Sequence, residues 1–441
     1  MILQAGGLAG FLGKDSSSYL MKALKLLTHR AFKGFKILIE DMKEVDINSL
    51  NELKSNIALG YCIRDRFENF LFHGSFYKFE EGFLSKFSEL INQNDYEGAS
   101  KILSKLDGAY AFVLYNDNSL IYGRDPLGLK PLYIGRASNI IGVASEIKAL
   151  QASGLTQIEL VKPGYLFKES FDSQKSFIIK EIKFHSINES FENAIENTLK
   201  LICKSLECRV NNKAILGFSG GLDSSLLALL ISKLCDVELI TISTKGSRDE
   251  IDALNAAREL GIELHHIFIT KDILMGILKY LQNLIECNKI MDLSIGAIIY
   301  LTAKRAKELG YDTLILGQFA DELFGGYMKY LKLFKEHGKE VVDAVMRYDI
   351  LNAHEKSFPR DEKASSPFVE LILPYAQIDL VEYVASLPID MKLNPINDVR
   401  KQLLRKVAIA AGLPEDLAFK QKKAMQYSSG IQKLINKLID Y

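Results

Sequence analysis

The first 180 residues alternate short hydrophobic runs with polar turns. Two runs, Ala109–Tyr115 and Leu132–Ile134, are rich in β-branched and aromatic residues, and turn-forming residues such as Asn116-Asp117-Asn118 lie between them. Because this spacing is typical of antiparallel strands, it predicts packed β-structure with a few helices, among them Phe83–Gln93.

From about residue 190 the pattern changes to long helical periods between short apolar strands. The expected strands are Lys213–Phe218, Val237–Ser243, Leu264–Ile269 and Asp312–Leu316. This alternation favours βαβ units in a parallel sheet, which begin after a first helix at Phe191–Leu206. We therefore predict an α/β protein of two domains, residues 1–180 and residues 190–441.

The last hundred residues read as a helical C-terminal extension of the second domain. Their hydrophobic periodicity is helical from about residue 340, and prolines are expected to break it. These prolines are Pro359, Pro367, Pro374, Pro388 and Pro414.

A glycine loop follows the strand Lys213–Phe218. It reads Ser219-Gly220-Gly221-Leu222-Asp223-Ser224-Ser225 and leads into an apolar helix expected at Leu226–Leu234. A strand, a glycine turn and a helix N-terminus together direct backbone N–H groups at a phosphate. The hydroxyls of Ser219, Ser224 and Ser225 can donate to phosphate oxygens, and Asp223 can bind Mg²⁺. The loop contains neither the G-x-x-x-x-G-K-[ST] motif of proteins that transfer a γ-phosphoryl group nor the G-x-G-x-x-G motif of dinucleotide-binding proteins.

A second candidate loop, Gly317–Tyr327, follows the strand Asp312–Leu316. Open α/β sheets bind their ligands at the carboxyl ends of the strands, so both loops are expected at one edge. Asp321 is then a second carboxylate for the same Mg²⁺, and Gly317 a contact of the nucleotide.

These segments resemble a known family. Ser219–Ser225 is similar to the pyrophosphate loop of the N-type ATP pyrophosphatases. With Gly317–Tyr327, a K-x-x-L-R segment (Lys401 to Arg405) and a basic segment (Lys420–Lys423), it resembles the synthetase domain of the asparagine synthetase family, which includes the β-lactam synthetases. The N-terminal half resembles the glutaminase domain of that family, at Leu106–Phe112, Arg124–Tyr133 and Ala144–Leu150. The resemblance implies Ntn-hydrolase-like antiparallel layers followed by a doubly wound sheet like that of adenine nucleotide α-hydrolases.

The glutaminase-like half departs from the family at its catalytic positions. In the family this domain begins Met-Cys-Gly-Ile, and the exposed N-terminal cysteine is the nucleophile while its own α-amine is the base. Here Gly6 stands at the cysteine position, behind a five-residue extension, and His73-Gly74-Ser75 replaces an Asn-Gly-Glu segment. Cys62 is internal and is expected to pack in the core. We expect no glutamine hydrolysis, and a role as a scaffold or docking domain or in receiving ammonia from elsewhere.

The resemblance also implies a two-step reaction in the second domain. A carboxylate attacks the α-phosphate of Mg-ATP to give an acyl-AMP and pyrophosphate, and ammonia then displaces AMP to leave an amide. Lys422 matches the lysine that stabilises charge in the second step. Lys401 and Arg405 are equally compatible with helix packing and with phosphate binding.

Three departures affect the substrate. Gln318 stands where the family has a glutamate, and because a carboxamide cannot accept a proton from ammonium, Asp349 is the candidate proton acceptor. The alternative for Asp349, favoured by the sequence alone, is a surface carboxylate or a helix cap. Phe319 replaces a glycine. The stretch Asp292–Gly296 lacks the arginine that bacterial enzymes use to hold aspartate, so aspartate is the default substrate only.

Three functions therefore stay open. The favoured one is an ammonia-dependent ligase of asparagine-synthetase type that uses an amino acid carboxylate, ATP and ammonia. The others are an enzyme that adenylates a different acid, as β-lactam synthetases do, and a non-catalytic regulatory paralogue. The intact Ser219–Ser225 loop and Asp321 argue against the last. A homodimer, or a partner that supplies ammonia, is compatible with each.

Composition excludes other classes of function. Lys+Arg and Asp+Glu both count 55, so the net charge is zero and binding of nucleic acid is not expected. No apolar run approaches the roughly 18–20 residues of a membrane span, and the N-terminal residues lack the features of a signal peptide. The five cysteines show no metal or disulfide spacing, which predicts free thiols in the cytoplasm and no metal held by sulfur.

Overall fold

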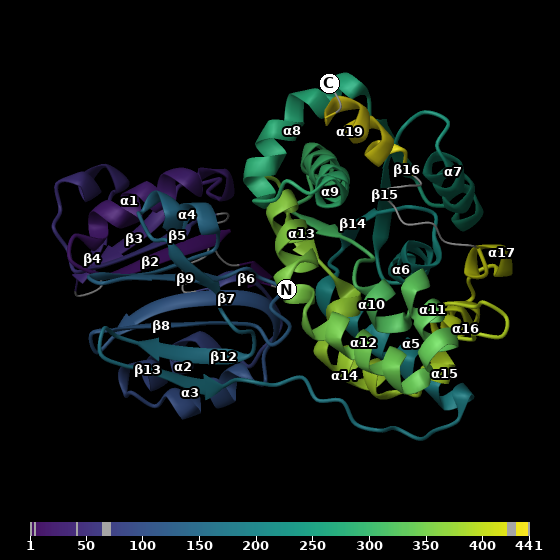
Figure 1. Ribbon diagram of the computed structural model, residues 1–441, viewed down its shortest axis with the longest axis horizontal. Helices are drawn as coiled ribbons and strands as arrows, with labels where there is room; N and C mark the ends of the chain where they lie inside the picture. The colour runs from purple at the N-terminus through teal and green to yellow at the C-terminus, as the bar shows by residue number, and fades with distance from the viewer. Residues whose placement is uncertain (1, 4–5, 41–42, 64–71, 421–428, 440–441) are drawn as a thin grey trace. The chain divides into compact units, whose positions relative to one another are not determined.

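The chain divides into two compact units (Figure 1). The structure is a computed structural model and describes residues 2–3, 6–40, 43–63, 72–420 and 429–439. The first unit holds the residues up to Glu181 together with His354–Glu362, and the second holds Ile182–Ala353 together with the residues from Lys363 on. A segment of the C-terminal half therefore belongs to the N-terminal unit, which the sequence pattern did not predict.

Two antiparallel sheets form the first unit. In spatial order, the first sheet contains β1 (Ile2–Leu3), β6 (Phe72–Lys78), β7 (Asp107–Asn116), β8 (Ser119–Arg124), β12 (Tyr165–Glu169) and β13 (Gln174–Ile178). The second contains β11 (Gln157–Leu160), β9 (Tyr133–Ala137), β10 (Ile140–Ala144), β2 (Gly7–Gly13), β5 (Ile57–Cys62), β3 (Phe35–Ile39) and β4 (Lys43–Val45). The antiparallel layers predicted for this half are confirmed.

Helices cover the outer faces of both sheets (Figure 1). Helices α1 (Ser16–Leu26) and α4 (Ile147–Ala152) lie on the second sheet, and α2 (Phe83–Asn92) and α3 (Tyr96–Leu103) on the first. Successive side chains of a strand point to opposite faces of the sheet, so one strand contributes residues to two hydrophobic cores. On β5, for example, Ala58 packs toward α1 while Leu59 packs between the sheets. Two 3₁₀ turns, Thr28–Arg30 and Ile47–Asn51, join the elements.

A parallel sheet forms the second unit. Its spatial order is β16 (Leu264–Phe268), β15 (Asp236–Ser243), β14 (Lys213–Gly217), β17 (Thr313–Ile315) and β18 (Glu370–Ile372). The parallel sheet expected from the sequence is confirmed, but β18 lies where helices alone were predicted. Its three residues are too few to show a period, and their pairing with β17 fixes them as a strand.

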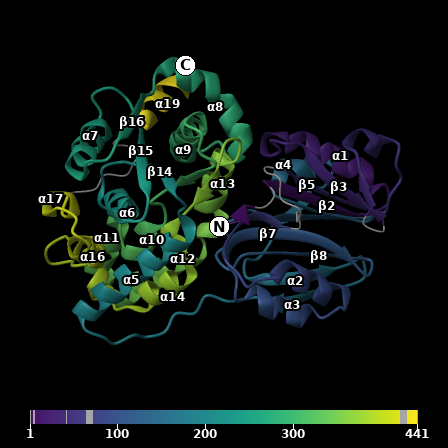
Figure 2. The same cartoon turned by 180° about the vertical axis from the view of Figure 1, so that it is seen from behind.

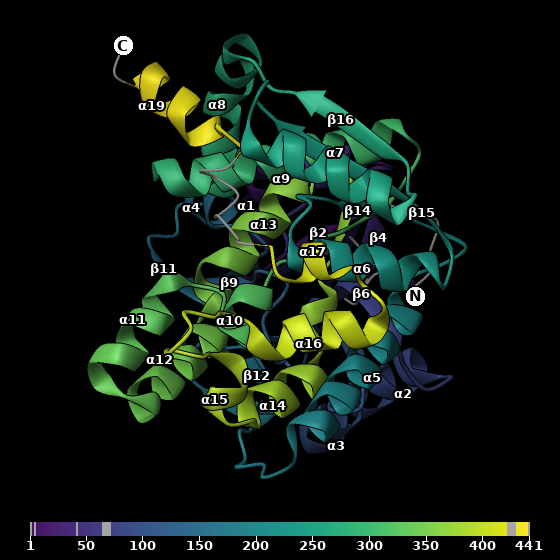
Figure 3. The same cartoon turned by 90° about the vertical axis from the view of Figure 1, so that its right-hand side faces the viewer.

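Helices lie on both sides of this sheet (Figure 2). The α-helices assigned to the second unit alone are α5 (Phe191–Arg209), α6 (Leu222–Ser232), α7 (Arg248–Leu260), α8 (Lys271–Ile285), α9 (Ile290–Glu308), α10 (Ala320–Phe324), α11 (Met328–His337), α12 (Lys339–Leu351), α14 (Ile378–Ser386), α15 (Ile389–Lys392), α16 (Gln402–Ala411), α17 (Glu415–Ala418) and α19 (Ile431–Ile439). Helix α19 packs beside α8 and α9 (Figure 3). None of the described helices is long and apolar enough to cross a membrane.

The prolines of the last hundred residues mostly begin helices rather than break them. Pro388 and Pro414 directly precede α15 and α17. Pro359 is the third residue of α13 (Ser357–Ser365) and does not interrupt it. Because the first turn of a helix needs no N–H donors, proline is tolerated at such positions.

Candidate active site

The two loops singled out in the sequence meet where the strand order of the parallel sheet reverses. Strand β14 comes first in the chain, and its neighbours are β15 on one side and β17 on the other. Its loop leads into α6, while the loop after β17 leads into α10. In open α/β sheets the crevice at such a switch point is where ligands bind.

Glycine is required at Gly220 of the first loop. Its φ is +67°, a conformation that L residues rarely adopt, and an added Cβ would lie 2.3 Å from the carbonyl oxygen of Asp252 in α7. Gly220 thus lets the loop pass directly over the backbone of α7.

Helix α6 begins at Leu222, four residues before the predicted start at Leu226. Asp223, Ser224 and Ser225 therefore occupy its first turn, where the helix dipole is positive. The Ser224 hydroxyl donates to the carbonyl of its N-cap residue Gly221 at 3.2 Å. The Ser225 hydroxyl is buried and has no hydrogen-bond partner among the described residues.

Two glycines of the second loop lie close to the candidate carboxylates. A Cβ on Gly317 would be in ordinary van der Waals contact with the Cβ of Asp223, at 3.4 Å. A Cβ on Gly326 would lie 1.8 Å from Asp321 Oδ1, so only glycine fits beside that carboxylate.

Asp223 and Asp321 converge on the ammonium group of Lys401. Lys401 Nζ lies 2.6 Å from Asp223 Oδ1 and 2.6 Å from Asp321 Oδ1, and its side chain is only 3% exposed. Lys401 precedes α16 with a φ of +56°, an uncommon backbone conformation for a residue with a side chain. The structure thus brings the two predicted carboxylates together, around a cation that the sequence left ambiguous.

The second basic residue of that segment has a packing role. Arg405 donates from Nε to the carbonyl of Arg400 at 2.8 Å and from Nη1 to that of Ala418 at 2.6 Å. These bonds hold the chain that leads to Lys420, which pairs with Asp252 at 2.9 Å. Lys422 and Lys423 lie outside the described residues.

A tyrosine and acid cluster lies next to Asp321. Tyr327 donates to Glu322 at 2.8 Å, and burial together with the charge of Asp321 raises the pKa of Glu322. Tyr330 donates to Asp349 at 2.6 Å, and Asp349 also pairs with Lys329 at 2.5 Å. Asp349 is therefore neither a helix cap nor an isolated surface acid.

Phe319 adopts a backbone conformation that suits glycine. Its φ is +74° while its side chain is buried. A left-handed conformation costs an L residue about 1–2 kcal/mol, so burial of the ring must offset this strain. Gln318 beside it is half-buried.

The donor set fits Mg²⁺ only together with phosphate oxygens. Carboxylates are the ligands that Mg²⁺ prefers, and this ion usually binds through one or two of them plus substrate phosphates. No group of three or more His, Cys, Asp or Glu among the described residues can hold a metal ion alone.

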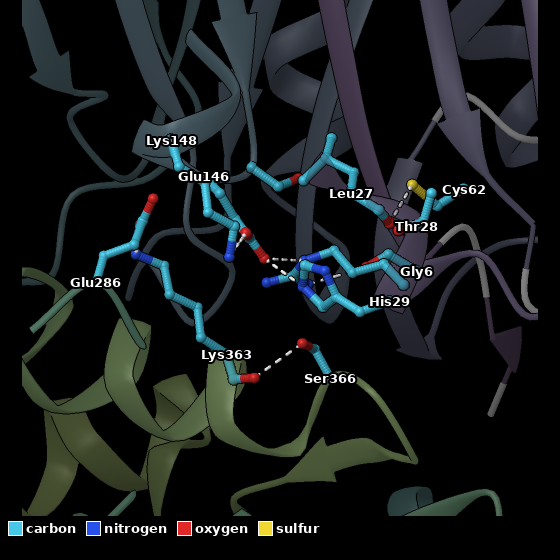
Figure 4. Close-up of polar contacts among 12 residues, drawn as sticks. Gly6, Leu27, Thr28, His29, Cys62, Glu146, Lys148, Glu286, Lys363 and Ser366 are labelled. Atoms are coloured by element: carbon cyan, nitrogen blue, oxygen red, sulfur yellow. Dashed lines mark hydrogen bonds and ion pairs between the residues drawn. The ribbon is translucent and has the colours of Figure 1, made fainter. Parts of the chain in front are cut away.

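The glutaminase-like unit has no thiol at its expected nucleophile position. The N–H of Gly6 donates to the carbonyl of Cys62 at 2.8 Å. The buried Cys62 thiol donates to the carbonyl of Leu27 at 3.7 Å (Figure 4). Cys62 belongs to the hydrophobic core under α1, which confirms the packing role expected for it.

Family models match both halves of the chain. The model described as asparagine synthase matches residues 204–359 and 335–441, more than half of the chain. The chain belongs to the asparagine synthase family. A glutamine amidotransferase domain model matches residues 85–152. By family, the protein is an ATP-dependent carbon–nitrogen ligase.

Named relatives agree with this assignment. A putative asparagine synthetase [glutamine-hydrolyzing] 1 from Methanocaldococcus jannaschii is 28% identical over 98% of this chain and 95% of its own length. Asparagine synthetase B of Escherichia coli K12 is 26% identical over 81% of this chain and 67% of its own. A solved structure, glutamine phosphoribosylpyrophosphate amidotransferase from B. subtilis, matches 59% of this chain and 80% of its own length. Its sequence identity to this chain is 18% and its TM-score is 0.33.

Sequence reasoning found the two loops because glycines and acidic residues mark them. It missed Glu322, Tyr327, Tyr330 and the bridging position of Lys401. Acid–tyrosine pairs from successive helices carry no fixed spacing, so only the K-x-x-L-R resemblance could have pointed to Lys401.

Proposed function

We propose that the second unit activates an amino acid carboxylate with Mg-ATP and transfers ammonia to it, with AMP and pyrophosphate as products. Aspartate is the default substrate, because relatives of the chain are named asparagine synthetase. The observation that carries the proposal is the convergence of Asp223 and Asp321 on one cation at the switch point of the sheet.

Asp223 and Asp321 are the residues that would hold Mg²⁺, and the bound ion would neutralise phosphate charge. The N-terminus of α6 and the hydroxyls of Ser219, Ser224 and Ser225 then stabilise the departing pyrophosphate, where negative charge develops. The buried Ser225 hydroxyl is a donor with no described partner, which suits a phosphate oxygen.

Lys401 is proposed to position the two carboxylates. Without a cation between them, two close carboxylates would repel each other and one would take up a proton. The ammonium charge of Lys401 offsets this repulsion before nucleotide binds. It lies close enough to the site to turn to a phosphate oxygen afterwards.

The second step needs a proton acceptor and a cation. Asp349, held by Tyr330 and Lys329, stays our candidate acceptor, and Lys422 our candidate cation. We propose free ammonia as the nitrogen source, since the position of the glutaminase nucleophile holds Gly6.

ATP–pyrophosphate exchange across the amino acids tests the first step. We expect exchange with aspartate, and loss of roughly two orders of magnitude or more in Asp223→Asn and Asp321→Asn. Asp236→Asn, at the opposite end of β15, is the matched control and should exchange as the wild type does. If exchange occurs only with a different acid, that acid rather than aspartate is the substrate. If no acid supports exchange, the proposal is refuted.

A further inference from the structure

A buried charged cluster fills the first unit at the positions where the family carries its glutaminase centre. Arg30, His73, Lys130 and Glu362 are all buried there, and Glu362 comes from the segment His354–Glu362. Residues so polar are rarely buried unless they are paired.

The guanidinium of Arg30 makes a bidentate pair with Glu362. Its Nη1 donates to Oε1 at 2.7 Å and its Nη2 to Oε2 at 2.8 Å. Nη1 also donates to the carbonyl of Gly6 at 3.0 Å, and Nε donates to Glu146 at 2.5 Å. Arg30 is therefore fixed between the position of the lost nucleophile and the carboxylate of Glu362.

Glu146 has other basic partners besides Arg30. His29 Nε2 lies 2.8 Å from Glu146 Oε1 (Figure 4), and Lys148 Nζ lies 2.6 Å from Oε2. Because this carboxylate is already shared by Arg30, Lys148 and the His29 ring, it cannot by itself balance Arg30 and Lys130.

A directed chain of hydrogen bonds reaches Glu362 from strand β2. The N–H of Leu8 donates to Ser145 Oγ at 3.0 Å, and this hydroxyl lies 3.2 Å from His73 Nδ1. Because the carboxylate of Glu362 can only accept, His73 Nε2 carries the proton and donates to Oε1 at 3.2 Å, and Nδ1 of the neutral ring accepts from the Ser145 hydroxyl. Burial lowers the pKa of His73 to about 4, although Glu362 opposes the shift, so the imidazole is neutral as this chain requires.

Arg30, His73 and Lys130 thus each face Glu362 with a hydrogen-bond donor or a positive charge. Burial alone would raise the pKa of Glu362, but Arg30 and His73 outweigh burial and hold this pKa well below its usual range. Lys130 Nζ, 4.0 Å from Oε1, adds a second positive charge.

We propose that the former glutaminase site has become a receptor for a carboxylate, and that Glu362 is its permanent, tethered ligand. Gly6 and His73 stand at positions expected for the lost glutaminase centre. The carbonyl of Gly6 now accepts a hydrogen bond from Arg30, and His73 donates one to Glu362. The buried cations of this unit, which lacks the nucleophile, are then explained by their binding of the Glu362 carboxylate. This inference concerns the first unit alone and holds whether or not the second unit adenylates aspartate.

Rescue by a free carboxylate separates a receptor from an ordinary packing contact. In full-length Glu362→Ala, amides of β2 and β6 should exchange hydrogen roughly a hundredfold faster, because breaking a buried ion pair leaves a charge uncompensated. Sodium acetate should restore protection, while sodium chloride at equal ionic strength should not. Glu355→Ala, an exposed acid of the same segment, should leave exchange unchanged with either salt.

A second variant covers the case in which Glu362→Ala does not fold. The double change Arg30→Met and Glu362→Met removes both charges at similar volume, so its β2 and β6 amides should be protected better than in either single variant. Acetate should have no effect on it. Wild-type protection in Glu362→Ala, protection unaffected by acetate in a folded Glu362→Ala, or a double variant no better than the singles would each overturn the proposal.

Discussion

At the scale of single residues, the candidate site depends on glycines that remove specific atoms. Gly220 and Gly326 each lie where a Cβ would collide with a neighbour, a backbone oxygen in one case and the Asp321 carboxylate in the other. Other glycines have no neighbour at the position of the missing Cβ and supply only a left-handed turn. Gly246 has a φ of +74° and nothing within 4 Å of its missing Cβ.

This contrast predicts a selective loss of activity. Gly220→Ala should reduce ATP–pyrophosphate exchange roughly a hundredfold, because the loop must move away from Asp252 and displace its phosphate-binding groups. Gly246→Ala has a similar backbone conformation and should cost only about 1 kcal/mol of stability without changing exchange. Equal exchange rates in the two variants would show that the loop does not bind pyrophosphate.

The loops could be predicted from the sequence because their glycines and acidic residues are contiguous. The pairing of Arg30 with Glu362 could not, since 332 residues separate the two. Neither residue has a neighbour in sequence that reveals its partner. The left-handed backbone of Lys401 was equally hidden, because nothing in a sequence identifies a strained lysine.

At the scale of elements, the predictable part of the fold was its strands and their direction. Apolar runs such as β14 and β15 were found nearly to the residue. Strand β18 was not, because its existence depends on pairing with β17 rather than on a local pattern. The start of α6 was placed too late because Asp223 and its serine neighbours read as loop residues, although they are favourable in a first helical turn.

Strand β6 also carries a titratable group that links stability to pH. His73 binds a proton near its usual pKa of 6.5 when unfolded, but only near pH 4 when folded. The unfolded state therefore binds more protons in this window, and the stability of the first unit should fall as pH drops from 6.5 toward 4, by about 2 kcal/mol at pH 5.

Urea midpoints of β6 peptides, read by pulsed hydrogen exchange at a fixed pulse pH, measure this loss. In His73→Gln, the urea midpoint should change less between pH 7 and 5 than it does in the wild type. His337→Gln changes an exposed histidine of the other unit and should follow the wild type. A wild-type midpoint that does not fall between pH 7 and 5 would contradict a neutral, buried His73.

At the scale of the whole molecule, the two units have diverged differently from the family. The second has the Ser219–Ser225 loop and the carboxylates Asp223 and Asp321, which we propose serve adenylation. The first keeps the layered fold but has Gly6 in place of a nucleophile and a carboxylate of its own chain on Arg30.

We predict that ammonium supports amide synthesis by the intact protein and that glutamine does not. The measurements are AMP formation and glutamate release with each nitrogen source. Removing residues 2–5 and changing Gly6→Cys would restore an N-terminal cysteine, yet should release no glutamate because Glu362 still engages Arg30 and His73. Glutamate release by the unaltered chain would refute an inactive glutaminase.

The assignment of His354–Glu362 to the first unit has a consequence for biosynthesis. A ribosome finishes residue 181 long before residue 362, and at 5–20 residues per second the interval is roughly 10 to 40 s. During that time the nascent N-terminal unit must hold Arg30 and Lys130 without the carboxylate of Glu362. The first unit is therefore expected to complete its folding, by pairing Glu362 with Arg30, late in translation or after it. A chaperone that holds the unit would act in this interval.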